Sequence, residues 1–328
     1  MSGRPGQPAR ILLTGAGGFV GRHLLRALRA AFPEAVLIGA RRRMAEGPVP
    51  GADETVSLDV DDGAALADVV ATVRPDAVLH LAAYADVGAS FRNPLAVWRT
   101  NVLGTVALGE AVLQAAPRVP FLMASSGEVY GLAFQSGQPV AEDTLLAPAN
   151  PYAASKAAAD LAVGEMALRG LRAVRLRAFT HTGAGQADGF AVAAFAHQIA
   201  RIEVGHQPPV LRTGALDRWR DFLDVRDVCA AYVAALANVD SLPSGIAINI
   251  CSGKPRRIGD ILQTLLRLSG VEAAVEQDAA RLRPTDVESV QGDPALAQRA
   301  LGWRPMVPWE ETLESVLADW RARVAAGE

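Results

Sequence analysis

Tyr152 and Lys156 stand four residues apart directly after Pro151, and this pair is chemically the most informative part of the sequence. Proline favours the first position of a helix, and residues four apart on a helix project from one face. An ammonium group beside a phenol favours the phenolate. We therefore expect Lys156 to lower the pKa of Tyr152 from its usual value of about 10, so that Tyr152 can exchange a proton near neutral pH. Lys156 is one of two lysines in the chain, against thirty arginines.

Ser126 follows a strand-like apolar run and precedes this helix. A hydroxyl group at this point can polarise the carbonyl oxygen to which Tyr152 gives a proton. Tyr-x-x-x-Lys alone arises by chance in many helices, so its meaning depends on these surroundings. Together the three residues predict reduction of a carbonyl group or its reverse.

A glycine-rich segment, Thr14–Gly21, lies between a short apolar run and a helical pattern. Gly15, Gly18 and Gly21 allow a tight turn, close approach of the backbone to a pyrophosphate, and close packing of the next helix. The N-terminus of that helix favours phosphate. This context predicts a dinucleotide site, with a purely structural turn as the alternative.

The next apolar run ends at Arg41, where an NAD-selective site usually places a carboxylate for the ribose hydroxyls. A guanidinium group suits a 2′-phosphate, so Arg41 with Arg42 favours NADP(H), and NAD(H) is the alternative. A solvated basic loop is the other interpretation of these arginines.

Short apolar runs alternate with longer helical patterns through the first half of the chain. This alternation, with runs that are apolar throughout, predicts an α/β fold with a Rossmann-like, doubly wound parallel sheet covered on both faces. The strand-like runs are 10–14, 35–39, 77–82, 119–124 and 172–178, and the helical patterns are 19–31, 62–73, 93–116 and 152–169.

After about residue 180 this rhythm loosens into connections rich in glycine and proline. We expect an NADP-binding Rossmann domain over 8–180, which also receives part of 215–250. Residues 181–325 are expected to form mainly a smaller C-terminal α/β lobe that binds the substrate. The long loop 132–150 is expected to rim a site. Helical patterns in the second half span 190–203, 226–237, 257–268 and 308–324.

Composition excludes several functional classes. The formal charge of −3 and the lack of a basic stripe argue against nucleic acid as a partner. No run reaches the roughly 18 apolar residues of a membrane-spanning helix, so no membrane association is expected. Cys229 and Cys251 lack any metal-ligand or disulfide spacing, which predicts no metal site and a reducing, cytoplasmic location.

Several motifs together resemble the extended short-chain dehydrogenase/reductase family, the NAD-dependent epimerases and dehydratases that act on nucleotide sugars. The spacing Gly-x-x-Gly-x-x-Gly is similar to that family, as are the segments Ser125–Gly131 and Pro151–Lys156. Later segments resemble the GDP-mannose branch, most closely the GDP-6-deoxy-D-mannose reductases and next the GDP-mannose 4,6-dehydratases. The remaining matching segments are His80–Ala83, Thr100–Thr105, Arg220–Val228, Asn249–Gly253, Arg283–Val287 and Leu301–Pro305.

The resemblance implies contacts to the cofactor beyond the glycines and arginines named above. Lys156 would hold the nicotinamide ribose beside Tyr152, and Asp59 with Val60 would contact the adenine. Asp59 could equally cap the helix that follows. The further cofactor positions are Phe19, Val20, Leu81, Ala82, Ala83 and Asn101.

The resemblance also implies a site for a GDP-sugar. Arg220 and Arg283 would bind the diphosphate, with an ion pair as the alternative for each. Phe190 lies where the family's guanosine pocket begins. The other expected substrate contacts are Asp86, Ser90, Ser126, Glu128 and Thr180, of which Asp86 and Ser90 could instead be turn or cap residues.

Two residues depart from the family pattern after the sixth strand. Thr180 replaces an asparagine and Ala184 replaces a proline, so the orientation of the sugar is less defined than the cofactor chemistry. His181, in the same loop, is interpreted as a structural residue.

The resemblance leaves the choice of reaction to a few residues. Glu128 holds the position of the dehydratase base, but Gly127 stands where dehydratases carry a serine, threonine or aspartate. This favours an NADPH-dependent reductase of a GDP-4-keto-6-deoxyhexose that acts at C4 and gives a GDP-6-deoxyhexose such as GDP-D-rhamnose. The alternatives are a GDP-mannose 4,6-dehydratase, a nucleotide-sugar 4-epimerase and a catalytically silent nucleotide-binding protein. A homodimer is expected to form through the helices 93–116 and 152–162.

Overall fold

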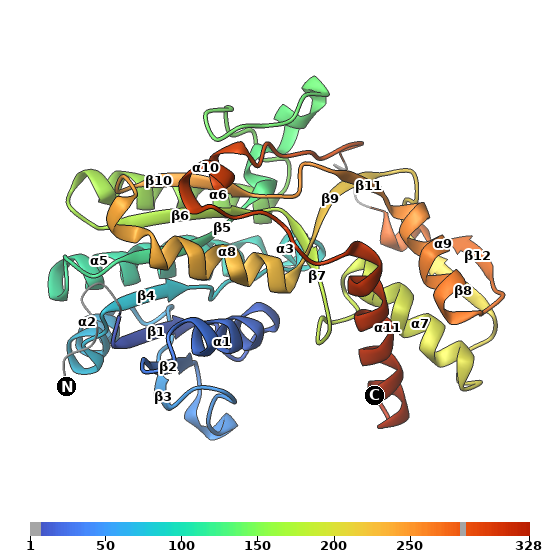
Figure 1. Cartoon of the computed structure of the whole chain (residues 1–328), viewed down its shortest axis with the longest axis horizontal. Coiled ribbons are helices and arrows are strands. Elements are labelled where there is room, and N and C mark those ends of the chain that lie inside the picture. Colours follow the sequence, from blue (N-terminus) through green and yellow to red (C-terminus); the bar gives the residue numbers. More distant parts are fainter. Residues whose placement is uncertain (1–7, 283–286) are drawn as a thin grey trace.

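A single parallel sheet organises the larger lobe of the protein (Figure 1). In the computed structural model, which describes residues 8–282 and 287–328, this sheet has seven strands in the order β10–β6–β5–β4–β1–β2–β3. The strand order reverses between β1 and β4, where doubly wound folds bind their ligands. The strands are β1 (Arg10–Thr14), β2 (Val36–Arg41), β3 (Glu54–Ser57), β4 (Ala77–His80), β5 (Phe121–Ser126), β6 (Ala173–Ala178) and β10 (Ile246–Ile250).

Helices cover both faces of this sheet, as the apolar runs predict. Leu13 and Leu37 pack on one face against α1 (Phe19–Ala31), α8 (Val225–Ala237) and α10 (Ala295–Leu301). Leu12 and Ile38 pack on the other face against α2 (Gly63–Val73), α5 (Thr105–Ala115) and α6 (Pro151–Leu168). Successive residues of one strand are thus buried on opposite faces, which explains why the strands show no polar alternation. The sheet therefore confirms the predicted Rossmann-like fold.

The helical pattern 93–116 is interrupted in the structure. It divides into α4 (Pro94–Trp98), a π-helical turn η2 (Arg99–Gly104) and α5. The wider turn carries Asn101, whose side chain bonds outside the helix to the backbone of Tyr84 and to Ser155. Such π-turns commonly mark functional sites, and periodicity alone does not reveal them.

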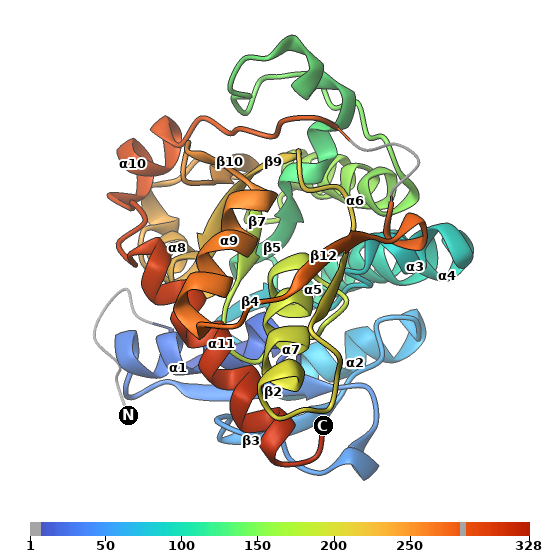
Figure 2. The same cartoon turned by 90° about the vertical axis from the view of Figure 1, so that its right-hand side faces the viewer.

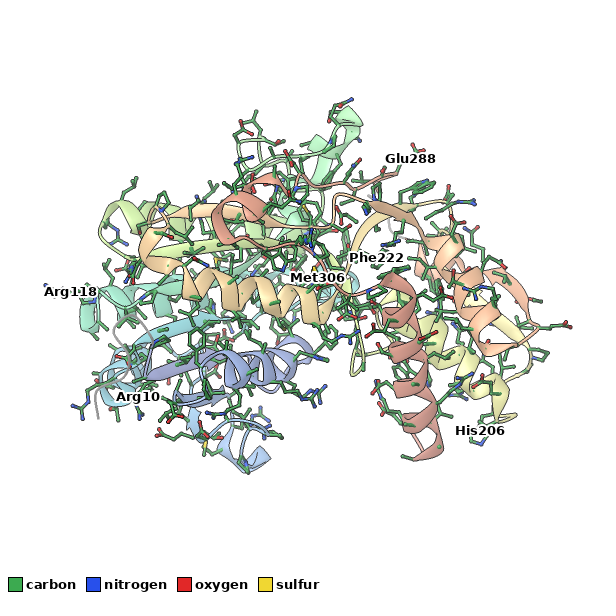
Figure 3. The ribbon with its side chains drawn as sticks, in the orientation of Figure 1. Arg10, Arg118, His206, Phe222, Glu288 and Met306 are labelled. Atoms are coloured by element: carbon green, nitrogen blue, oxygen red, sulfur yellow. The ribbon has the colours of Figure 1, made fainter. Side chains whose placement is uncertain are left out.

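Three helices and a two-stranded sheet form the smaller lobe, which Figure 2 shows facing the viewer. Phe195 on α7 (Ala191–Glu203), Leu262 on α9 (Ile258–Ser269) and Trp320 on α11 (Trp309–Ala325) are buried together in its core. The sheet pairs β8 (Val210–Thr213) with β12 (Ala274–Gln277). In Figure 3, His206 marks the far tip of this lobe, and Arg10 and Arg118 mark the opposite end of the molecule.

A third sheet, β11–β9–β7, lies where the lobes meet, close to the labelled Phe222 in Figure 3. Its strands are β7 (Thr180–Thr182), β9 (Trp219–Asp224) and β11 (Pro255–Arg257). Asp221 on β9 is fully buried and accepts hydrogen bonds from the backbone N–H groups of Ser252, Gly253 and Gly292 at 2.8, 2.9 and 3.2 Å. One carboxylate thus ties together three segments at the junction.

The loop after β5 is more regular than its sequence indicates. Residues Gly127–Ser136 form a 3-10 helix, η3, broken at Gly131, and Val140 forms a β-bridge to Gly292. The remaining short helices are η1 (Met44–Glu46), α3 (Val87–Arg92), η4 (Val239–Ser241) and η5 (Ala279–Arg281). Among the described residues, no helix is long and apolar enough to cross a membrane.

The division of the chain into two units stays a proposal. We propose that 8–180 together with α8 and β10, both within 215–250, make up the larger unit. Residues 181–325 otherwise supply mainly the smaller lobe.

Candidate active site

The start of α6 sets the position of the catalytic candidates. Asn150 caps this helix, because its Oδ1 atom accepts the N–H of Ala153 at 2.8 Å, and Pro151 occupies the first turn. Lys156 is buried and donates from Nζ to the carbonyl oxygen of Ala124 at 2.5 Å. The structure therefore brings α6 onto the end of β5, as the motifs predict.

The side chain of Ser126 interacts with the Tyr152 phenol. Burial raises the pKa of Tyr152 to about 12, the interaction with Ser126 lowers it, and the charge of Glu128 raises it. The expectation that Lys156 lowers this pKa is wrong for the structure, because desolvation dominates. Burial also lowers the pKa of Lys156 to about 8, against the opposing effect of Asp160. Tyr152 is thus a protonated phenol at neutral pH.

Glu128 is held beside these residues. Its backbone N–H donates to Ser126 Oγ at 3.2 Å, and its Oε2 atom accepts from Asn150 Nδ2 at 3.3 Å. Its neighbour Gly127 has no room for a side chain, because a Cβ atom there would lie 2.8 Å from the ring of Phe179. A carboxylate is therefore present next to a position closed to a second acid.

The glycine loop is shaped for close backbone approach. Gly15 has a φ of 68°, and a Cβ atom on it would lie 2.9 Å from the backbone nitrogen of Ala82. A Cβ atom on Gly21 would lie 2.3 Å from the carbonyl oxygen of Gly15, so α1 packs directly on the turn. Gly18 caps α1 without using a side chain. These constraints fit a pyrophosphate cradle at a helix N-terminus.

A cavity of about 400 Å³ lies over this loop. Most predicted cofactor residues line it: Gly15, Gly18, Arg41, Arg42, Asp59, Val60, Leu81, Ala82 and Ala83. Sequence reasoning missed Thr14, Gly17, Ala40, Leu58, Tyr84 and Thr100, which reach the same space through the fold.

Four predicted cofactor residues are absent from the described lining of this cavity: Phe19, Val20, Gly21 and Asn101. Phe19, at the start of α1, stacks on His181 with ring centroids 6.3 Å apart. Asn101 is buried and its side chain bonds to Tyr84 and Ser155. Its contact to the cofactor stays a prediction.

Two arginines lie at the end of β2. Arg41 lines the cavity and donates from Nη1 to the carbonyl oxygen of Gly47 at 2.9 Å. Arg42 forms an exposed ion pair with Asp59, with 3.5 Å between Nε and Oδ2. Positive charge therefore stands beside the cavity where the ribose of a dinucleotide would lie.

A second cavity, of about 510 Å³, lies between the lobes. The predicted substrate residues Asp86, Glu128, Thr180, Phe190 and Arg220 line it. The described linings of the two cavities do not include Ser126, Tyr152 or Lys156. The segment from Leu81 to Asp86 connects the two spaces, because its start lines the first and its end lines the second.

Some predicted substrate contacts have structural partners. Asp86 caps α3 by accepting the N–H of Ala89 at 3.0 Å, although it also faces the cavity. Ser90 is fully buried and donates to the carbonyl oxygen of Val87 at 2.6 Å, so it does not face the cavity as predicted. Arg283 lies outside the described residues.

His181 is held by its own backbone, with Nδ1 2.8 Å from the carbonyl oxygen of Phe179. Burial lowers its pKa, so the ring is neutral near pH 7. Its ring also borders the cavity between the lobes. The Nδ1 contact fixes the orientation of the ring, which agrees with its interpretation as a structural residue.

Arg212 and Arg281 line the cavity between the lobes and were not found by sequence reasoning. They also border a further polar cavity of about 450 Å³, which Arg201 and Glu276 line as well. No short motif marks these residues, because β8, α7 and η5 bring them together only in the folded chain.

Residues 11–251 match the model of the NAD dependent epimerase/dehydratase family. The chain belongs to this family. It is 36% identical to the GDP-6-deoxy-D-mannose reductase of Pseudomonas aeruginosa, with 96% of this chain and 98% of that protein covered. It is 31% identical to a UDP-glucose 4-epimerase of Azospirillum brasilense, with 93% of each chain covered. The structure of RMD from Pseudomonas aeruginosa complexed with NADPH is 35% identical and superposes with a TM-score of 0.84, with 96% of this chain and 99% of that one covered.

Proposed function

We propose that this epimerase/dehydratase family member is an NADP(H)-dependent reductase of a GDP-4-keto-6-deoxyhexose. It would reduce the ketone at C4 and release a GDP-6-deoxyhexose such as GDP-D-rhamnose. The main support is the similarity to a GDP-6-deoxy-D-mannose reductase along 96% of the chain. Ser126 and Tyr152, whose side chains interact, and the buried Lys156 supply the matching chemistry.

The reduction needs a proton and a hydride at the two ends of one carbonyl group. NADPH, when bound, supplies the hydride to C4 and leaves as NADP⁺. Ser126 polarises the ketone oxygen, and the Tyr152 hydroxyl gives its proton to the alkoxide that forms. A phenol whose pKa lies at about 12 is protonated at neutral pH, which is the state that a reductase needs.

The cofactor site supports NADP(H) over NAD(H). The glycine loop leaves no room for side chains against a pyrophosphate. Arg41 faces the cavity and stands where an NAD-selective site usually places a carboxylate. Lys156 would hold the nicotinamide ribose, and Asp59 with Val60 would contact the adenine. The solved structure in complex with NADPH adds support from a similar chain.

The nucleotide end would lie in the cavity between the lobes. Arg220 is buried there, and its Nη1 atom donates to the carbonyl oxygen of Trp219 at 2.7 Å, which fixes the guanidinium group. We assign the diphosphate to Arg220 and Arg283, and the guanosine to the space beside Phe190 and Arg212. Asp86, Thr180 and Glu128 border the part of this cavity that would hold the sugar.

A 4,6-dehydratase remains the second candidate because Glu128 faces the cavity. Dehydration needs this carboxylate to remove the C5 proton and a companion acid to assist loss of the C6 hydroxyl group. Gly127 carries no acid, and the ring of Phe179 closes the space beside it. This observation favours the reductase.

We also propose a homodimer in the cytoplasm. Leu95, Leu103, Leu161 and Leu168 are 80, 63, 60 and 90% exposed on α4, the π-turn and α6, which pack together. A second copy of this surface would cover such leucines. Both cysteines are buried and free, as expected in a reducing compartment. Light scattering should give twice the chain mass, and a monomer for the Leu103→Glu variant.

The deciding experiment mixes the protein with GDP-4-keto-6-deoxymannose and NADPH. Absorbance of the reduced nicotinamide should fall, and NMR should identify a GDP-6-deoxyhexose and its C4 configuration. Conversion of GDP-mannose to the 4-keto sugar without net change of cofactor would instead establish a dehydratase. NADPH binding without turnover of any nucleotide-sugar ketone would indicate a catalytically silent protein.

A further inference from the structure

A buried ion cluster lies behind the catalytic helix, at the side of α6 that faces the sheet. Asp160 is fully buried one helical turn after Lys156. Its Oδ1 atom accepts from Nη1 of Arg175 at 2.7 Å and from Nη2 of Arg177 at 2.9 Å. Its Oδ2 atom accepts from Ser125 Oγ at 2.6 Å and from Nε of Arg177 at 3.1 Å. The carboxylate is therefore fully hydrogen-bonded by β5 and β6.

Two successive residues of β5 bind to two successive turns of α6. The carbonyl oxygen of Ala124 accepts a hydrogen bond from the Lys156 ammonium group, and the Ser125 hydroxyl group donates one to the Asp160 carboxylate. The next residue, Ser126, carries the hydroxyl group that interacts with Tyr152. Asp160 thus fixes the register between the helix that carries the phenol and the strand that carries the serine.

The same carboxylate also balances charge. Lys156, Arg175 and Arg177 bring three cations into one largely buried region, and Asp160 is the acid that Lys156 and both arginines share in the described structure. Another titratable group that faces Lys156 is His80 on β4, whose pKa burial and the Lys156 charge lower to about 3, so that its ring stays neutral. Glu128 acts on Tyr152 from η3.

We propose that Asp160 is a positioning residue for the reduction: its carboxylate sets the Ser126–Tyr152 register and keeps Lys156 in its cationic form. This inference rests on the proposed reductase function for its kinetic consequences. Its electrostatic part concerns the protein alone. Loss of the acid disfavours the protonated lysine, because it removes the negative charge that raises the pKa of Lys156 and leaves Arg175 and Arg177 without their shared carboxylate.

The two-lysine composition offers a direct test. Lysine labelled with ¹³C at Cε gives signals only from Lys156 and Lys254, and a Lys254→Arg variant assigns them. We expect Lys156 in the wild type to titrate with a pKa of about 8. In Asp160→Asn the midpoint should fall by about one pH unit. An unchanged midpoint in Asp160→Asn overturns the electrostatic part of the inference.

Arg175→Gln is the matched control, because it breaks the same ion pair from the other side. A charge role predicts that the Lys156 midpoint does not fall in this variant, in contrast to its fall in Asp160→Asn. A purely structural role predicts that both variants lose stability and that neither moves the midpoint. If Asp160→Asn is unstable, the wild type and both variants are titrated with saturating NADPH, which stabilises the folded state.

Ser125→Ala tests the register separately, since it removes one bond to Asp160 and no charge. We expect kcat to fall at least about tenfold, with the sugar KM within about twofold and the Lys156 midpoint unmoved. Full kcat in Ser125→Ala overturns the positioning part. The lysine titration needs no substrate, so it stands even if the wild type fails to oxidise NADPH with the 4-keto sugar, a failure that would contradict only the proposed function.

Discussion

Arg41 reaches over the glycine loop, and its Nη2 atom lies 3.4 Å from the position that a Cβ atom on Gly17 would occupy. The guanidinium group is thus placed between the end of β2 and the backbone that would cradle the pyrophosphate. We expect Arg41→Ala to raise the KM for NADPH about tenfold to a hundredfold and to leave that for NADH within about twofold, since only NADPH carries the 2′-phosphate.

Arg43→Ala is the matched control for this change, because Arg43 is exposed and does not line the cofactor cavity. Steady-state kinetics with both cofactors checks the prediction. Equal losses for NADPH and NADH in Arg41→Ala would contradict a role in recognising the phosphate.

Tyr152→Phe removes the phenolic proton and keeps the ring. We expect kcat to fall on the order of 10²–10⁴-fold, while the Kd for NADPH stays within about twofold. Stopped-flow or steady-state turnover and cofactor titration by fluorescence measure the two quantities. A parallel loss of NADPH affinity would assign Tyr152 to binding and not to proton transfer.

Gly127→Ser introduces the kind of side chain that dehydratases carry at this point. Because its Cβ atom would lie 2.8 Å from the Phe179 ring, we expect the free energy of unfolding to fall by about 1–3 kcal/mol. We also expect no conversion of GDP-mannose. Gly189→Ser is the control for stability, since nothing lies within 4 Å of a Cβ atom at that site. Dehydratase activity in Gly127→Ser would show that the glycine alone separates the two reactions.

His80 links β1 to α5 and makes stability depend on pH. Its Nδ1 and Nε2 atoms lie 2.7 and 2.9 Å from the hydroxyl groups of Thr14 and Thr105. Burial and the charge of Lys156 lower its pKa to about 3. The unfolded chain therefore takes up a proton below pH 6.5 that the folded protein excludes, and stability falls as pH decreases from about 6.5 towards 3.

Urea unfolding at several pH values between 7 and 4 measures this effect. His80→Gln should show a shallower decline, by up to about 1.4 kcal/mol per pH unit. Identical slopes for wild type and variant would mean that the buried imidazole does not titrate differently in the two states.

The sequence predicted the sheet and the catalytic candidates because each depends on short, local patterns. The glycines of the loop and the Tyr152–Lys156 pair lie within single turns or helices, so their spacing alone defines their geometry. The small sheets were missed, since β7, β8 and β11 are short and carry polar residues such as Thr180 and Arg257. Helical periodicity could not reveal the π-turn, because the bonds of Asn101 to Tyr84 and Ser155 arise from tertiary structure.

The raised pKa of Tyr152 was missed for a related reason. Residue spacing shows that Lys156 is near, but it does not show how much water each group loses on folding. The same holds for Arg212 and Arg281, which share a cavity although 69 positions separate them in the chain. A pKa that depends on burial, and a cavity that distant segments line, can be found only in the folded structure.

The late position of β10 and α10 in the sequence has a consequence for how the protein is made. Strand β10 completes one edge of the seven-stranded sheet, and α10 completes the cover of one of its faces. The larger lobe therefore lacks its full core until residue 301 has been synthesised. A nascent chain that ends at β6 would expose apolar surface such as Leu176. The protein should therefore resist truncation poorly and require chaperone protection during translation.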